Sequence, residues 1–309
     1  MARRWIALVA LVALAGCAED WDPFNRLTSL RVLAVQSEPV APITGETTTL
    51  TPLVYTPPDV EVGSYAWTWC PFAGPASEGS PCLVTEEEAR ELAGGAADTI
   101  PPFDLGDEPT ATFENTIDPD LLAALCAGVG DVPALTDCQA GFPVQIRLTV
   151  TTEDEEIVTV RTLYLRFDEE SEPNANPTLD GLAAEIDGEE VALGDTPEVT
   201  LPRRQETVIT ADVPEESSEE YTRVRDDGEV EQRREQLLLT WFIESGDTSD
   251  ERTVFIDGSV ALEDATENAW EPAGEDDYER DESLLLVVLR DGREGVTWRS
   301  ARVALEPDP

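Results

Sequence analysis

Cysteine is the residue type whose spacing in this chain could do chemistry. Four of the five cysteines form two pairs, Cys70 with Cys82 and Cys126 with Cys138, and each pair is twelve positions apart across a loop containing Pro or Gly. In an oxidising compartment this spacing favours two local disulfides, although four cysteines allow three connectivities. A Cys₄ zinc site is a weaker alternative, because no C-x₂-C spacing is present.

The fifth cysteine, Cys17, follows a segment with the layout of a secretory signal. Arg3 and Arg4 precede ten apolar residues (5–14), and two small residues stand just before the cysteine. The apolar segment is too short for a membrane-spanning helix, which needs about 20 residues. The order Leu-Ala-Gly-Cys at 14–17 resembles the lipobox of bacterial lipoproteins.

That resemblance implies a signal peptide at 1–16 that is removed before Cys17, a diacylated thiol, and an acyl chain such as palmitate on the new amino terminus. A single acyl chain binds a membrane only reversibly, so several chains would make a durable lipid anchor. In the same family, Ala rather than Asp at position 18 favours the outer membrane of a Gram-negative cell envelope. The alternative is an ordinary secreted protein with a cysteine near its cleavage site.

The charge of the chain is strongly negative. The 309 residues include 66 acidic residues against 20 basic ones, all of them arginine, for a net charge of −46. A surface of this sign repels nucleic acid and anionic headgroups, so nucleic acid is not an expected partner. The hydrophobic content of 41% with seven Trp predicts folded cores rather than disorder.

Several catalytic chemistries lack their residues. The chain has no His and no Lys, which excludes Ser-His and Cys-His nucleophiles, His-ligated metals and lysine Schiff bases. A carboxylate-based hydrolase is a less favoured hypothesis, because it would need two acids about 5–10 Å apart in a cleft. We therefore expect no enzyme, no cofactor and no catalytic residue.

Calcium or carbohydrate binding is the alternative function. Acidic loops at 247–251 and 275–279 could offer carboxylates to calcium, with Trp270 and Tyr278 beside them as exposed aromatics for a sugar. Neither loop has the spacing or the Gly of an EF-hand. Solvated turns are the favoured interpretation, so no metal ligands are assigned.

Short alternating strands separated by turns recur twice along the chain. The first pass predicts strands at 30–35, 46–55 and 64–70 and a closing hairpin at 142–150 and 157–167. The second pass predicts strands at 182–186, 189–193, 206–213, 237–244, 283–290 and 296–305. Thr68-Trp69 in the first pass corresponds to Thr240-Trp241 in the second.

The first pass is interrupted at about 71–142. A capping box from Thr85 to Glu88 predicts a short helix that stops at Gly94-Gly95. A second helix is expected at 118–127, with proline in its first turn. Between the two helices, residues 111–113 predict a brief strand.

A tryptophan on a central strand, the strand pair before it and the terminal hairpin resemble bacterial immunoglobulin-like domains. The resemblance implies an all-β fold of two immunoglobulin-like β-sandwich domains in tandem, the first with a partly helical, disulfide-containing insertion. It also implies that Trp67 or Trp69, and Trp241, are core aromatics. The predicted divisions after the signal peptide are a tether at 17–25, a first domain at 26–168, a linker at 169–177 and a second domain at 178–306.

Residues 220–236, EYTRVRDDGEVEQRREQ, predict a protruding charged hairpin with a tight turn at Asp227-Gly228. Arg223 and Arg225 can face Glu229 and Glu231 across that turn. Charge of this kind commonly guards a strand edge.

Together these patterns predict a lipid-anchored surface protein with a non-catalytic structural, adhesion or protein-interaction role. The expected partners are the membrane, through the anchor, and other envelope proteins or carbohydrate.

Overall fold

The first half of the chain forms two sheets that face each other. The computed structural model describes residues 23–127, 138–167, 173–225 and 229–308. One sheet has the order β1-β2-β5 and the other the order β4-β3-β6-β7. The strands are β1 (Arg31–Glu38), β2 (Thr47–Tyr55), β3 (Ser64–Cys70), β4 (Asp104–Gly106), β5 (Ala111–Glu114), β6 (Phe142–Thr151) and β7 (Glu156–Leu165).

Buried and half-buried residues alternate along β6, because successive side chains of a strand point to opposite faces of the sheet. Every second residue of β6 is buried, and two of those residues, Ile146 and Leu148, lie opposite Trp69 and Trp67 of β3. Both tryptophans are buried, and the Trp69 ring lies 5.3 Å from the Phe113 ring of the facing sheet in an edge-to-face contact. The predicted aromatic positions therefore hold the two sheets together.

The segment between β3 and β6 is partly helical, as predicted, and it also completes both sheets. The helix α2 (Glu86–Ala93) begins at the Thr85–Glu88 capping box, and α3 (Pro119–Ala127) has proline in its first turn. Short 3₁₀ turns, η1 (Ala76–Glu78) and η2 (Gly94–Thr99), flank α2. Because β4 pairs with β3 and β5 pairs with β2, the segment is an integral part of the sandwich.

The second half of the chain forms another pair of sheets, with orders β10-β19-β18-β14-β16 and β15-β17-β11-β8-β9, and a separate hairpin of β12 and β13. A turn, η3 (Glu215–Ser217), and a short helix, α4 (Leu262–Thr266), connect strands. The strands are β8 (Gly181–Ile186), β9 (Glu189–Leu193), β10 (Thr200–Leu201), β11 (Thr207–Asp212), β12 (Glu220–Val224), β13 (Val230–Arg234), β14 (Leu237–Ile243), β15 (Asp247–Thr248), β16 (Arg252–Phe255), β17 (Glu267–Glu271), β18 (Glu282–Arg290) and β19 (Val296–Leu305).

The two sandwiches share one strand order. β2 lies between β1 and β5 as β11 lies between β8 and β17, and β3 pairs with β6 as β14 pairs with β18. The closing hairpin β6–β7 corresponds to β18–β19. Trp69 and Trp241 lie in corresponding strands, and both are buried. The predicted all-β tandem is confirmed.

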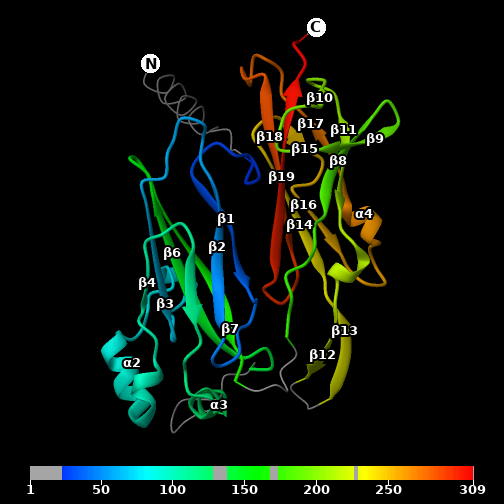
Figure 1. The fold of residues 1–309 in the computed structure, drawn as a ribbon. Coiled ribbons are helices and arrows are strands. Elements are labelled where there is room, and N and C mark those ends of the chain that lie inside the picture. Colours follow the sequence, from blue (N-terminus) through cyan, green and yellow to red (C-terminus); the bar gives the residue numbers. More distant parts are fainter. Residues whose placement is uncertain (1–22, 128–137, 168–172, 226–228, 309) are drawn as a thin grey trace, which may run out of the picture.

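The two sandwiches pack side by side, so that the four sheets form one stack (Figure 1). The outer face of β1–β2 contacts the outer face of β14–β18–β19 through an apolar cluster distinct from the two sandwich cores. We call this cluster the inter-sandwich core; its buried members are Leu27, Leu33, Ala34, Tyr55, Phe242, Leu284, Leu286, Val288 and Val296.

Two arginines close the free edge of β1 where the sandwiches meet. Arg161 of β7 donates to the Val35 carbonyl, and Arg290 of β18 donates to the Leu33 carbonyl at 2.6 Å. An edge strand with unpaired carbonyls invites pairing with another chain. Here those carbonyls are satisfied by side chains from both sandwiches.

The first described residues, 23–27, pair with the second sandwich before the chain enters the first. Arg26 forms a parallel bridge with Ile243 of β14, the Leu27 N–H donates to the Ile243 carbonyl at 2.7 Å, and Arg26 pairs with Asp247 at 2.7 Å. Cys17 and the predicted signal peptide lie outside the described residues. No helix in the described ranges combines the length and the apolar character needed to cross a bilayer.

Candidate functional site at the distal end

We call the distal end the end of the stacked sandwiches that lies away from residues 23–27. It contains α2, α3, the loop 138–141, the linker residues 173–177 and the β12–β13 hairpin, while the C-terminus lies at the opposite end (Figure 1). Both disulfides stabilise loops there. They join Cys70 to Cys82 and Cys126 to Cys138, which is the local pairing that the spacing favoured.

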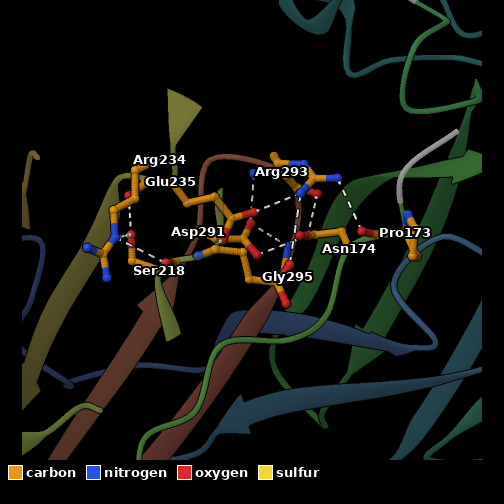
Figure 2. Close-up of polar contacts among 9 residues, drawn as sticks. Pro173, Asn174, Ser218, Arg234, Glu235, Asp291, Arg293 and Gly295 are labelled. Atoms are coloured by element: carbon orange, nitrogen blue, oxygen red, sulfur yellow. Dashed lines mark hydrogen bonds and ion pairs between the residues drawn. The ribbon is translucent and has the colours of Figure 1, made fainter. Parts of the chain in front are cut away.

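A buried carboxylate fixes the base of the hairpin (Figure 2). Glu235 stands between β13 and β14 with its side chain 1% exposed. It accepts from the Arg293 guanidinium at 3.2 Å and from the Glu219 N–H at 3.2 Å. The Arg293 guanidinium also lies over the Tyr221 ring of β12, 4.8 Å from its centroid. The hairpin is thus held at its root by charge and by ring contact.

The same network binds the linker to the β18–β19 turn. Asp291 accepts from the backbone N–H groups of Arg293 and Gly295, each at 2.7 Å, and from the Asn174 amide at 2.9 Å. A Cβ atom at Gly295 would collide with the Asp291 carboxylate and the Ala175 carbonyl. Glycine is therefore required at 295, and Asn174 attaches the described end of the linker, residues 173–177, to the second sandwich.

The Glu235→Gln variant is expected to lose part of the pH dependence of stability. Burial, followed by the charge of Asp291, raises the pKa of Glu235 from 4.5 to about 7. The folded state therefore binds this proton more tightly than the unfolded state, and acidification from pH 7 towards pH 4.5 stabilises the fold through this group by on the order of 1–3 kcal/mol. Urea unfolding at about pH 8 and about pH 5.5 measures the gain.

Titration of the many other acids is common to both proteins, so the comparison isolates Glu235. The exposed Glu185 on β8 provides the matched control, and Glu185→Gln should leave the gain unchanged. Equal gains in wild type and Glu235→Gln would contradict the raised pKa.

A glutamine side chain ties the hairpin to the first sandwich. Gln139 donates its amide N–H to the Val224 carbonyl at 2.5 Å and accepts the Val224 N–H at 2.8 Å, as a neighbouring strand would. It directly follows Cys138, so the disulfide to Cys126 limits its movement. The hairpin therefore contacts both sandwiches. Its predicted turn at Asp227-Gly228 lies outside the described residues.

One of the charge pairs predicted across the hairpin is present, while Glu231 forms its ion pair with Arg233 at 3.0 Å. Arg223 lies opposite Glu231, and Arg225 pairs with Glu229 at 3.7 Å. Such exposed pairs contribute little to stability, so they serve mainly to keep the hairpin soluble.

Exposed apolar side chains gather at the distal end. Of the five large apolar side chains that are exposed in the described part of the chain, only Val158 of β7 lies outside it. The other four are Leu83, Leu92, Val224 and Val230, and the exposed fraction reaches 69% at Leu92 and 67% at Val230. Exposed apolar groups amid an acidic surface are typical of protein contact sites.

One residue named for carbohydrate binding is not exposed. Trp270 is fully buried on β17 with its indole N–H donated to the Ser245 carbonyl at 2.7 Å, so the prediction of an exposed aromatic there is wrong. In the acidic loops, Asp247 pairs with Arg26, and Asp276 pairs with Arg204. Among the described residues, no group of three or more His, Cys, Asp or Glu side chains is arranged to hold a metal ion.

Two of the buried acids are held by contacts within the fold. Glu235 is paired with Arg293, and Asp291 accepts two backbone N–H groups, so both are committed within the fold.

Sequence reasoning missed the network of Figure 2, since Asn174 was assigned only to a polar linker. It also missed the inter-sandwich core. A signal for that core was available: β18 reads ESLLLVVLR, a continuous apolar run that indicates burial on both faces.

Each sandwich has the same order of main strands and a buried tryptophan on a corresponding strand, β3 in the first and β14 in the second. These two features define the chain as a tandem of immunoglobulin-like β-sandwiches. No protein-family model and no curated protein matches it. The chain is similar to the crystal structure of murine CEACAM1b, with 8% identity, a TM-score of 0.23, and coverage of 88% of this chain and 99% of that one.

Two other solved structures are similar at the same level. The D00-D0 domain of intimin has 7% identity and a TM-score of 0.21, with coverage of 90% of this chain and 98% of that one. Red sea bream transglutaminase has 10% identity and a TM-score of 0.22, with coverage of 92% of this chain but 32% of that one. The assignment to the immunoglobulin-like class rests on the strand order described above.

Proposed function

We propose that this protein is a lipid-anchored component of the cell envelope that holds its distal end towards a partner protein. The anchor is the acylated Cys17 of the lipobox-like segment, and Ala18 favours the outer membrane. The role is non-catalytic adhesion or assembly, since the chain has neither His nor Lys and its buried acids are paired internally.

One observation carries this proposal: the start of the described chain and the exposed apolar groups lie at opposite ends of the stack. Cys17 and Pro23 are six positions apart, which spans at most about 20 Å. Residues 25–27 are held by β14, so the tether leaves from a fixed place. An anchor at Cys17 therefore keeps that end near the membrane and turns the hairpin, α2 and α3 outward.

The charge distribution supports a protein partner rather than a lipid surface. A net charge of −46 repels anionic headgroups and nucleic acid. The same field attracts a basic protein and speeds its association at low salt. Apolar groups at the distal end then supply the short-range contact.

The Cys17→Ala variant is expected to move from the membrane fraction to the soluble fraction, because it lacks the thiol that carries the acyl chains. Fractionation of the envelope followed by immunoblotting measures the change. Ala18→Asp provides a matched variant, since it keeps the acylated cysteine and should shift the protein from the outer to the inner membrane. Retention of Cys17→Ala with the membranes would contradict the anchor.

A further inference from the structure

A groove with apolar walls lies between the two sandwiches. Its volume is about 520 Å³, and it is bordered by β1 and β7 of the first sandwich and by β14, β16 and β18 of the second. Small-molecule sites commonly lie at such junctions and have volumes of about 300–1,000 Å³. Leu238 and Phe242 are four positions apart on β14, so the lining extends over about 13 Å. The apolar walls are Phe24, Val32, Leu33, Ile157, Leu238 and Phe242.

Three arginines line the same groove, and none of its described lining residues is acidic. They are Arg31, Arg252 and Arg290. Glu251 directly precedes Arg252 in the chain, but it does not line the groove. Among the described residues, no carboxylate forms an ion pair with any of the three arginines. In a chain with 66 acidic and 20 basic residues, this grouping is a local reversal of charge.

Neutral groups hold the three guanidinium groups in place. Arg31 donates to the Phe24 carbonyl, and the Arg252 guanidinium lies over the Phe24 ring, 4.3 Å from its centroid. Arg290 donates to the Leu33 carbonyl at 2.6 Å. Because a guanidinium has five N–H donors, these contacts leave donors for a further acceptor.

The cations of the groove repel one another. Burial, followed by the charge of Arg252, lowers the pKa of the Arg290 guanidinium, and the charge of Glu294 opposes that shift. Glu294 lines a neighbouring hollow and not this groove. An anion among the three arginines would relieve the repulsion and would accept charge-assisted hydrogen bonds.

We propose that this groove binds a small amphipathic anion, namely a carboxylate that carries an aliphatic tail. The carboxylate accepts hydrogen bonds from the arginines, and the tail packs against the apolar walls and leaves water. The proposal does not rest on the proposed function, because neither Cys17 nor the distal end contributes a residue to the groove.

The net charge of −46 acts against such a ligand only at long range. Salt screens exposed charges that are more than about 10 Å apart, whereas partly buried charges at contact distance are screened much less. The chain as a whole attracts cations, but the groove should select an anion. The sign of the charge that is selected therefore distinguishes binding in the groove from unspecific association.

Photoaffinity labelling in cell lysates prepared without detergent tests the full-length chain, whether or not it is anchored. Three probes share the tail of decanoate, with a diazirine and an alkyne, and differ in the head group: a carboxylate, an alcohol or an amine. We expect the carboxylate probe to label β14 at least about tenfold more than the alcohol probe. Excess decanoate should suppress this label, and the amine probe should label β14 no more than the alcohol does. Mass spectrometry of the immunopurified protein measures and locates the label.

Arg252 provides the variants, because its side chain is exposed and its replacement should not prevent folding. Arg252→Gln should lower the carboxylate label about threefold to fivefold, which is the scale of one exposed ion pair. Arg252→Glu should bring the carboxylate label down to that of the alcohol and raise the amine label. Arg299→Glu is the matched control, since Arg299 is exposed on β19 and does not line the groove, and it should leave all three labels unchanged.

Equal labelling by the carboxylate and alcohol probes would overturn the proposal, and so would a carboxylate preference that survives Arg252→Glu. Asp20 and Asp22 precede Phe24 in the chain. Labelling that appears only after both are replaced by asparagine would also overturn it, because the groove would then belong to the chain's own acidic segment. Fractionation of Cys17→Ala tests the proposed function separately, because the labelling does not depend on the anchor.

Discussion

Replacing Glu244 by alanine is expected to lower the free energy of unfolding by about 3–5 kcal/mol. The Glu244 carboxylate is 3% exposed and accepts from the Tyr55 hydroxyl at 3.0 Å, the Tyr278 hydroxyl at 3.3 Å and the Leu284 N–H at 3.1 Å. It also pairs with Arg280 at 3.4 Å. Alanine would remove the acceptor of the Leu284 N–H and the partner of Arg280, and it would leave the two tyrosine hydroxyls only the Leu27 carbonyl at 3.0 Å and the Glu282 carbonyl at 2.9 Å.

The cost falls on the contact between the sandwiches, because Tyr55 belongs to β2 of the first sandwich and Glu244 follows β14 of the second. Burial, followed by the charge of Glu244, raises the pKa of Tyr278 to about 12 and raises that of Tyr55 as well. Both hydroxyls therefore stay protonated and remain donors over the whole neutral range.

Urea unfolding followed by tryptophan fluorescence measures the loss. Glu244→Gln keeps an acceptor for the tyrosines and should lose only about 1–2 kcal/mol. Glu251→Ala, at an exposed position near β16, should stay within about 0.5 kcal/mol of wild type. A Glu244→Ala protein as stable as Glu251→Ala would show that the carboxylate does not link the sandwiches.

Leu286→Ala is expected to cost as much stability as Leu285→Ala, about 2–5 kcal/mol each. The two leucines are neighbours on β18 and face opposite ways. Leu285 is fully buried in the core of the second sandwich, while Leu286 is buried in the inter-sandwich core. Each truncation leaves an apolar cavity, and the two cavities lie on opposite faces of the sheet that contains β18.

The pair distinguishes two views of the tandem. If the sandwiches were independent units on a string, Leu286→Ala would cost almost nothing, because its face would be open to water. If they unfold as one body, both variants will lower the urea midpoint to a similar extent. Hydrogen exchange read by mass spectrometry locates the effect: Leu286→Ala should raise exchange in β1 and β2, which lie in the other sandwich.

Local patterns sufficed to predict most of the strands. The alternation in β6 and the aromatic run of β3 fixed two strands of the first sandwich, and the Asp187-Gly188 turn of the second has both residues at positive φ, as a two-residue hairpin turn requires. The short strands β4, β10, β15, β16 and β17 escaped prediction, because two to five residues carry too little periodicity.

The burial of Trp270 on β17 was also missed, because this strand is too short to show a clear alternation. Trp270 is predicted to be an exposed aromatic beside the acidic loops, yet Asn268 and Trp270 are both buried at alternate positions of the strand. The distal end was harder still. Gln139, Asn174 and Asp291 come from loops far apart in sequence, and only the stacking of the sandwiches brings their partners within reach.

The pairing of residues 23–27 with β14 changes what an anchor holds. In a simple string of domains, the lipid would hold the first sandwich, and the second would hang from the linker. Here the segment next to the tether is bound to the second sandwich, through the β-bridge between Arg26 and Ile243 and the ion pair between Arg26 and Asp247. If Cys17 carries the proposed lipid anchor, a molecule nicked in the linker would keep both halves on the membrane, and a pull on the distal end would be shared by the two sandwiches.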